Sequence, residues 1–154
     1  MGEKEDQRER VNRELVELLQ ELRVALPGVQ VLFAFLLTVP FSQGFVETTS
    51  FQRDLFFATL AATAISTTLL IAPSAWHRIH FRQKDKEEIL IASNKLSIAG
   101  LAFLALAMIG AVMLIADFAF SGTLTVISGI VAAVVLASFW AAIPLIRHPG
   151  RPRT

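Results

Sequence analysis

LSIAGLAFLALAMIGAVMLIA, residues 96–116, holds 21 consecutive positions without an acidic or basic side chain, between Lys95 and Asp117. A helix of about 20 apolar residues is long enough to cross the hydrocarbon core of a bilayer, which is about 30 Å thick. In a soluble helical protein of this size nearly every helix shows water a polar face, and this stretch has none. It therefore predicts a membrane-spanning helix.

Three more stretches also lack charged residues, two before this one in the chain and one after it. They extend the prediction to the whole chain. They are residues 24–46, 55–77 and 118–146. The mean hydropathy is +0.58, and only 18% of the residues are charged, against about 25% in soluble domains. We expect an all-α integral membrane protein, a four-helix transmembrane bundle over residues 27–146. The predicted spans are about 28–46, 55–76, 89–116 and 123–146.

A separate amphipathic segment, residues 1–26, precedes the first predicted span. Val11, Leu15, Leu18, Leu22 and Leu26 recur at helical spacing, with charged residues between them. Residues 3–23 hold seven acidic and five basic residues, whereas helices that lie on a membrane surface carry a mainly basic polar face. The mixed face favours packing against protein, such as another copy, over lying on the lipid surface. Pro27-Gly28 is expected to break or kink the helix there.

The basic residues predict the orientation, because Lys and Arg are enriched in cytoplasmic loops. Five precede the first span, four lie in residues 78–86, three lie in the tail 147–154, and Lys95 lies at the edge of the same side. Arg53 alone lies on the other side. We therefore expect both termini and the central loop in the cytoplasm, with residues 1–26 as a cytoplasmic helix and residues 147–154 as a disordered tail.

The segment between the second and third spans begins with two histidines three residues apart. Trp76, His77 and His80 are interpreted as amphipathic anchors at the headgroup level, since a zinc site would need more ligands and fewer neighbouring cations. Arg78 and Arg82 belong to a short basic cluster of the kind that attracts anionic lipid headgroups. With acidic residues close by, the cluster is a weak nucleic-acid footprint, so membrane lipids are the expected partners and nucleic acid is not.

Polar residues within the spans are few, and two interpretations stay open for each group. Gln30, Asn94 and Lys95 are candidates for a solute or proton site, although Lys95 reaching back to the interface and pairing with Glu21 or Glu88 is favoured. A threonine stripe in the second span is a candidate pore lining, although threonine hydroxyls also satisfy carbonyls of their own helix. The stripe consists of Thr59, Thr63 and Thr67.

Small residues four apart form ladders, which in lipid mark faces where helix backbones approach closely. The ladder of the fourth span consists of Thr125, Gly129, Ala133, Ala137 and Ala141, and that of the second span of Ala58, Ala62 and Ser66. These eight positions are the predicted helix-packing residues.

The sequence offers little to build an active site with. It has no cysteine, which removes disulfides and thiolate metal sites. We found no nucleophile–base pair, phosphate-binding glycine loop or metal-ligand spacing. We therefore expect no enzymatic activity, no bound metal and no cofactor.

Three stretches carry a family resemblance: ELRVALPGVQVLFAFLLTVPF at 21–41, FQRD at 51–54 and LLIAPSAWHR at 69–78. Together they resemble DUF6328, a family of small four-span membrane proteins of unknown function common in actinobacteria. The resemblance implies a four-helix bacterial membrane protein in the cytoplasmic membrane. It implies no activity and assigns no functional residues.

The leading functional hypothesis is a non-enzymatic helix-packing or accessory subunit, either a homo-oligomer or a component of a larger membrane complex. The alternative is an oligomeric ion or small-solute channel lined by the second span. A lipid- or quinone-binding role stays open near Trp76, Lys95 and Arg23.

Overall fold

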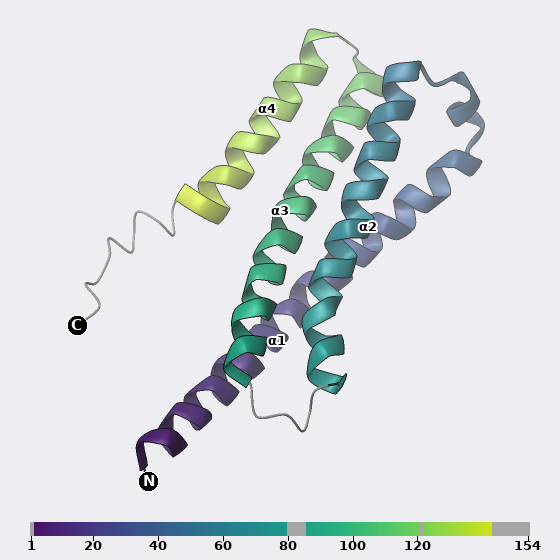
Figure 1. The fold of residues 1–154 in the computed structure, drawn as a ribbon. Coiled ribbons are helices and arrows are strands. Elements are labelled where there is room, and N and C mark those ends of the chain that lie inside the picture. The colour runs from purple at the N-terminus through teal and green to yellow at the C-terminus, as the bar shows by residue number, and fades with distance from the viewer. Residues whose placement is uncertain (1, 80–85, 121, 143–154) are drawn as a thin grey trace. The chain divides into compact units, whose positions relative to one another are not determined.

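The computed structural model describes residues 2–79, 86–120 and 122–142, with side chains placed for residues 9–76, 78, 89–120 and 122–140 (Figure 1). Four long helices account for most of this part of the chain. They are α1 (Gly2–Thr38), α2 (Ser50–Ile79), α3 (Lys86–Ala119) and α4 (Thr123–Ala137). The described residues contain no strand, so the all-α prediction is confirmed.

All four helices are long and apolar enough to cross a membrane. The candidate spans are Glu9–Phe41, Ser50–Trp76, Ile89–Ala119 and Thr123–Trp140. Short 3₁₀ turns at Val39–Phe41 and Gln43–Glu47 link α1 to α2, and a π-helical turn at Ser138–Ala142 continues α4.

The chain divides into two compact units, and α2 and α3 contribute to both. Unit 1 comprises Met1–Glu47 and Leu60–Leu104, and unit 2 comprises Thr48–Thr59 and Ala105–Thr154. Each unit has its own helix contacts.

Helix α1 continues through Pro27, so the break that the sequence allowed there does not occur. Proline lacks an N–H and therefore removes the hydrogen bond to the Arg23 carbonyl, but only that one. Leu22 and Val29 are buried on either side of the proline, and their packing holds the two halves of the helix in one element. The amphipathic segment and the first span thus belong to the same helix.

The apolar stripe of α1 packs against helices of its own chain, where the sequence had suggested another copy as the partner. Leu22 and Val29 form the core of unit 1 with Leu70 of α2. Leu18 and Leu26 of α1 and Leu101 and Leu104 of α3 pack around this core. Val11 and Leu15, further toward the N-terminus, are buried as well.

Helix α1 ends at Thr38, before the end of the predicted first span at residue 46. Pro40 lies in the first turn of the following 3₁₀ helix. A proline disfavours helical backbone at the residue before it, so the α-helix gives way to 3₁₀ turns at this point. The hydroxyl of Thr38 donates to the carbonyl of Phe35, 2.7 Å away, within the last turn.

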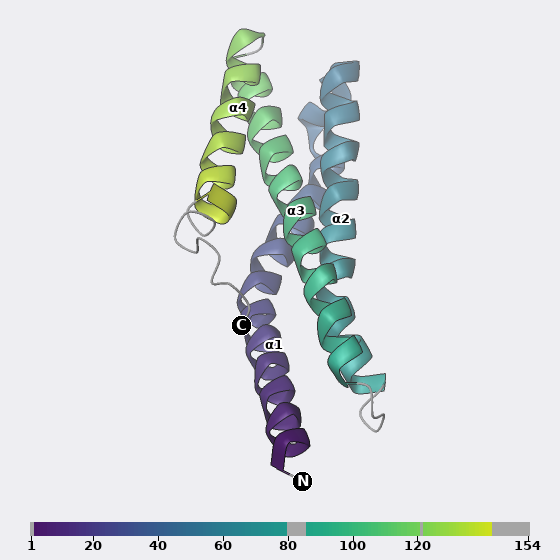
Figure 2. The same ribbon diagram turned by 60° about the vertical axis from the view of Figure 1, so that its left-hand side comes forward.

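Unit 2 contains the beginning of α2, the end of α3 and all of α4, and both ribbon views show α4 beside α3 there (Figures 1 and 2). The turn between α3 and α4 is shorter than expected, because Asp117 lies inside α3 and not in the turn. Gly122 begins α4 with φ of +69°, a left-handed conformation that glycine adopts without a steric penalty.

Candidate functional site

The buried face of α2 follows a repeat that alternates steps of four and three residues. Its members are Gln52, Phe56, Thr59, Thr63, Ser66, Leu70 and Pro73. An average step of 3.5 residues keeps one face of a helix turned toward a neighbour along its whole length, as in left-handed helix packing. We call these seven residues the α2 seam. It is the face on which α2 contacts the rest of the chain.

Small residues of α3 meet the α2 seam at close range in unit 1. The Ser66 hydroxyl donates to the carbonyl of Gly100, 2.8 Å away. A Cβ added at Gly100 would lie 2.8 Å from side-chain atoms of Leu70, which is closer than real Cβ atoms come. Glycine is therefore the residue that lets the two helices approach this closely.

The same arrangement recurs in unit 2 at two glycines. A Cβ at Gly110 would overlap the hydroxyl of Thr59, which donates to the Leu55 carbonyl at 2.7 Å. A Cβ at Gly129 of α4 would come within 2.6 Å of the Met113 side chain on α3. In both helix pairs of unit 2 a neighbouring side chain thus occupies the space that a Cβ would need, although the flexible Met113 side chain can move aside more easily than Thr59.

Three polar side chains from three helices join in unit 2, and we call Gln52, Asp117 and Thr125 the Asp117 cluster. The Gln52 amide Nε2 donates to Asp117 Oδ2 at 2.9 Å. The Thr125 hydroxyl donates to Asp117 Oδ1, also at 2.9 Å. Both carboxylate oxygens thus accept a hydrogen bond, one from α2 and one from α4.

A capping box positions Gln52 for this contact. The Thr49 N–H donates to Gln52 Oε1 at 3.1 Å, and the Gln52 N–H donates to Thr49 Oγ1 at 3.2 Å. This reciprocal pair is the T-x-x-Q signature of a helix start. It fixes the Gln52 side chain and leaves its amide N–H₂ free to reach Asp117. The signature at residues 49–52 is readable in the sequence but was not among the predicted features.

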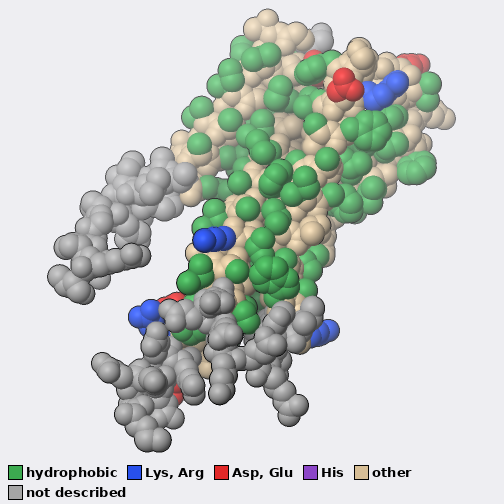
Figure 3. All heavy atoms as spheres, in the orientation of Figure 1, with side chains coloured by type: hydrophobic (Ala, Val, Ile, Leu, Met, Phe, Trp, Pro, Cys, Tyr) green, Lys and Arg blue, Asp and Glu red, His purple; other side chains and the backbone are tan. Residues whose placement is uncertain are grey.

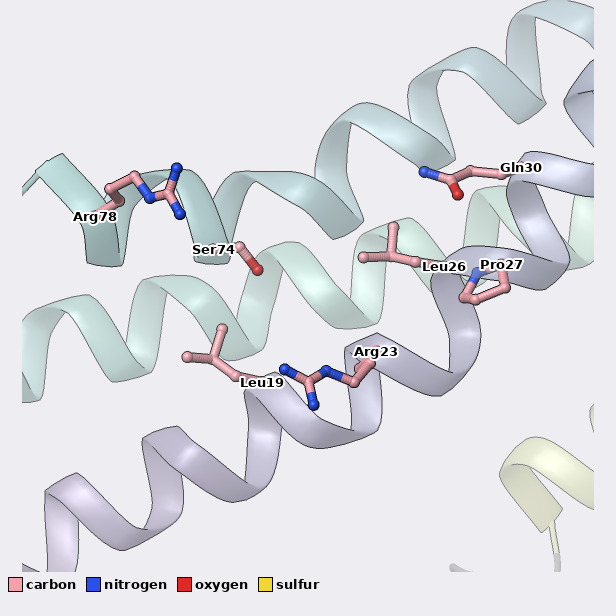
Figure 4. A pocket seen from close by; sticks show the side chains of 7 residues that line it. All are labelled: Leu19, Arg23, Leu26, Pro27, Gln30, Ser74 and Arg78. Atoms are coloured by element: carbon pink, nitrogen blue, oxygen red, sulfur yellow. The ribbon is translucent and has the colours of Figure 1, made fainter.

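A pocket of about 760 Å³ lies between α1 and α2 in unit 1 (Figure 4). We call it the arginine pocket, because Arg23 and Arg78 both line it. The other lining residues are Leu19, Leu26, Pro27, Gln30 and Ser74. Its volume falls within the range of about 300–1,000 Å³ typical of ligand sites.

The structure brings together some of the predicted packing residues and leaves others apart. Thr125, Gly129 and Ser66 are buried in helix contacts, and Ala62 and Ala133 are half-buried. Ala58 and Ala137 are exposed. The side chain of Ala141 lies outside the described residues.

The predicted polar and interface residues also separate into groups. Thr59 and Thr63 belong to the α2 seam, and half-buried Thr67 donates to the Thr63 carbonyl at 2.8 Å. Gln30 and Arg78 both line the arginine pocket, whereas Asn94, Lys95 and Trp76 are exposed elsewhere. His80 and Arg82 lie outside the described residues, as does the side chain of His77. Among the described residues, no three His, Cys, Asp or Glu side chains gather as a metal site would require.

Hydrophobic side chains dominate the face of the molecule drawn in Figure 3. Exposed apolar residues occur on all four helices, among them Phe35, Phe57, Ile115 and Ile130. A water-soluble protein would not expose so much apolar surface. Together with four helices of spanning length in the described residues, this surface defines a multi-span α-helical membrane protein.

The chain belongs to DUF6328, a family of unknown function whose model matches residues 4–144. The family resemblance seen in the sequence is thereby confirmed. Neither a curated protein nor a solved structure matches the chain.

Proposed function

We propose that this protein is a non-enzymatic packing subunit of a membrane assembly, as a homo-oligomer or as an accessory component of a larger complex. The observation that carries the proposal is the small-residue face of α4, which is covered at its beginning and uncovered further along. Thr125 and Gly129 on this face are buried, Ala133 is half-buried, and Ala137 is exposed.

The uncovered part of this face has the chemistry of a helix contact. Helices in lipid gain nothing from hydrophobic burial, so they associate where small side chains let their backbones approach. Gly129 already makes such a contact with Met113 inside the chain. Ala137, two turns further along α4, is exposed and offers the same kind of surface. A helix from another chain fits this face.

Helix α1 supports the proposal with its remaining polar face. Its apolar stripe is used within unit 1, and charged residues of its N-terminal half, such as Arg13 and Glu17, are exposed. Arg10 Nε and Glu14 Oε1 form an ion pair at 3.2 Å within the helix. A face of paired, mixed charges complements a protein partner better than an anionic lipid surface.

The threonines that a channel lined by the second span would use are engaged in packing. Thr63 is 0% exposed, and Thr59 lies against Gly110. Thr67 donates to a carbonyl of its own helix. These contacts favour the packing role for the second span over the lining of a hydrated pore.

The distribution of basic residues supports a plasma-membrane protein with both termini in the cytoplasm. Arg10, Arg13 and Arg23 precede the uncharged run of α1, and Arg78 follows that of α2. Arg53 is the single basic residue near the opposite ends of the spans. This asymmetry is the one that the positive-inside rule describes.

The experiment is native mass spectrometry of the protein after mild detergent extraction, with crosslinking in membranes beforehand. We expect a wild-type assembly larger than the monomer. Ala137→Leu should reduce the assembled fraction about tenfold, which corresponds to about 1.4 kcal/mol, because the larger side chain separates the helices.

The matched control is Val135→Leu, which enlarges an exposed residue about 160° around α4 from Ala137. It should leave the assembly intact. A wild-type protein that crosslinks only as an isolated monomer contradicts the proposal. Equal effects of the two substitutions would show that this face of α4 is not the contact.

A further inference from the structure

The arginine pocket is formed by one face of α1 and one face of α2. Leu19, Arg23, Leu26 and Gln30 follow one another at helical spacing along α1. Ser74 and Arg78 are one turn apart on α2. Figure 4 shows the two sets of side chains on facing sides of the hollow.

Both arginines stand where a charge-free run meets charged sequence. The run 24–46 begins directly after Arg23, and the run 55–77 ends directly before Arg78. Basic residues at such positions lie at the level of the lipid headgroups. Gln30 lies about 10 Å further along α1 than Arg23, at a rise of about 1.5 Å per residue. The pocket therefore extends from the headgroup level into the bilayer.

The polar groups of the pocket lack partners within the described part of the chain. Neither guanidinium forms an ion pair there, since the ion pair found among the described residues joins Arg10 and Glu14. The Gln30 amide and the Ser74 hydroxyl are exposed, and neither forms a hydrogen bond with another described residue. Two positive charges without an acidic partner at the edge of an apolar run attract an anion.

We propose that the arginine pocket binds the phosphate of an anionic phospholipid. The planar guanidinium groups of Arg23 and Arg78 donate to the phosphate oxygens, a geometry that arginine forms well. The Ser74 hydroxyl and the Gln30 amide donate to the glycerol and ester oxygens. Leu19, Leu26 and Pro27 supply an apolar wall for the beginning of the acyl chains.

A bound lipid fits this pocket better than a small soluble anion does. Three of the seven lining residues are apolar, and a free phosphate would use only the arginine end of the hollow. None of the residues that line the pocket belongs to α4, so substitutions in the pocket leave the proposed assembly face of α4 unchanged.

The experiment measures lipid retention by purified full-length protein in detergent, using native mass spectrometry. The probes are phosphatidylglycerol, which is anionic, and phosphatidylcholine, which carries no net charge. We expect wild-type protein to retain phosphatidylglycerol in preference. Arg23→Gln with Arg78→Gln should weaken its binding about tenfold or more, because the phosphate loses both charged hydrogen-bond donors.

The matched control is Arg10→Gln with Arg13→Gln, which removes the same charge from exposed positions of α1 outside the pocket. It should leave phosphatidylglycerol retention within about twofold of wild type. Equal losses in the two double variants would overturn the proposal, because they would trace binding to net charge. Equal retention of the two lipids by wild-type protein would also overturn it.

Two further measurements distinguish a lipid seated in the pocket from a lipid held elsewhere and from a free anion. Ser74→Trp keeps both arginines and fills the pocket from an exposed position of α2, so it should also abolish retention. Wild-type-like retention in this variant would overturn the site. Excess inorganic phosphate should leave the bound lipid in place. Displacement of the lipid by phosphate would show that a free anion is the ligand and would overturn the lipid assignment.

Discussion

Glycine at position 110 shows how a single residue sets the distance between two helices. The position lies in the middle of α3, where glycine is otherwise unfavourable by about 1 kcal/mol relative to alanine. The gain is contact with Thr59, whose hydroxyl occupies the space that a Cβ would need. The helix thus accepts a poor helix former because the neighbouring helix comes so close.

Gly110→Ala should destabilise the protein by about 1–3 kcal/mol, because an added methyl in a close-packed contact forces the helices apart. The measurement is far-UV circular dichroism during unfolding in mixed micelles of dodecyl maltoside and SDS. Adding Thr59→Ala should recover part of the loss by clearing the space.

Gly28→Ala is the control, because nothing lies within 4 Å of a Cβ at that position. It should be neutral or stabilising by up to about 1 kcal/mol, since alanine is the better helix former. A Gly110→Ala protein as stable as wild type would contradict the close contact.

At the level of helices, the Asp117 cluster shows how one carboxylate can link three helices of unit 2. Asp117 belongs to α3 and accepts hydrogen bonds from Gln52 of α2 and Thr125 of α4. Gln52 and Thr125 are both buried. If the Asp117 carboxylate were removed, each would lose a hydrogen-bond partner that water cannot fully replace. The cluster thereby fixes the axial register of the three helices at this end of the unit.

Asp117→Asn should lower the free energy of unfolding by about 1–2 kcal/mol, because the two hydrogen bonds to a charged carboxylate are replaced by weaker ones to a neutral amide. The same micelle unfolding assay measures the effect. Thr125→Val should lower the free energy of unfolding less in the Asp117→Asn protein than in the wild type, since the two residues share one interaction.

Asp54→Asn serves as the comparison, because Asp54 is an exposed acidic residue in the first turns of α2. Its replacement should change stability by less than about 0.5 kcal/mol. If both aspartates gave the same loss, charge at the membrane interface would account for the effect and the cluster would not.

At the scale of the whole molecule, the chain's lack of cysteine permits a direct test of its orientation in the membrane. Glu17→Cys places a thiol on the exposed face of α1, and Gln43→Cys places one in the 3₁₀ turn before α2. With a membrane-impermeant maleimide, intact cells should label Gln43→Cys, and Glu17→Cys should react only after the cells are permeabilised. The reverse pattern would contradict cytoplasmic termini.

Four helices of spanning length, and the absence of strands from the described residues, were predictable from the sequence alone. The reason is that a bilayer imposes one simple requirement, a charge-free helical run of about 20 residues. Runs such as residues 96–116 meet this requirement and can be recognised from the sequence. The basic residues likewise predict an orientation without knowledge of any contact.

The faces on which the helices meet were decided by tertiary structure. A ladder of every fourth residue, such as Ala58 and Ala62, turns about 40° around the helix at each step, so it drifts away from any neighbour. The α2 seam alternates steps of four and three and stays in contact. Gly110 and Thr59 belong to different helices, and their contact cannot be predicted before the pairing of the two helices is known.

The arginine pocket depends on tertiary structure for the same reason. Arg23 and Arg78 are 55 residues apart, and each alone reads as an ordinary residue at the end of an apolar run. The sequence determined how each helix meets the bilayer, because that depends on the composition of one segment. Only the packing of α1 beside α2 decided that two such arginines line one pocket, because that depends on contacts between segments.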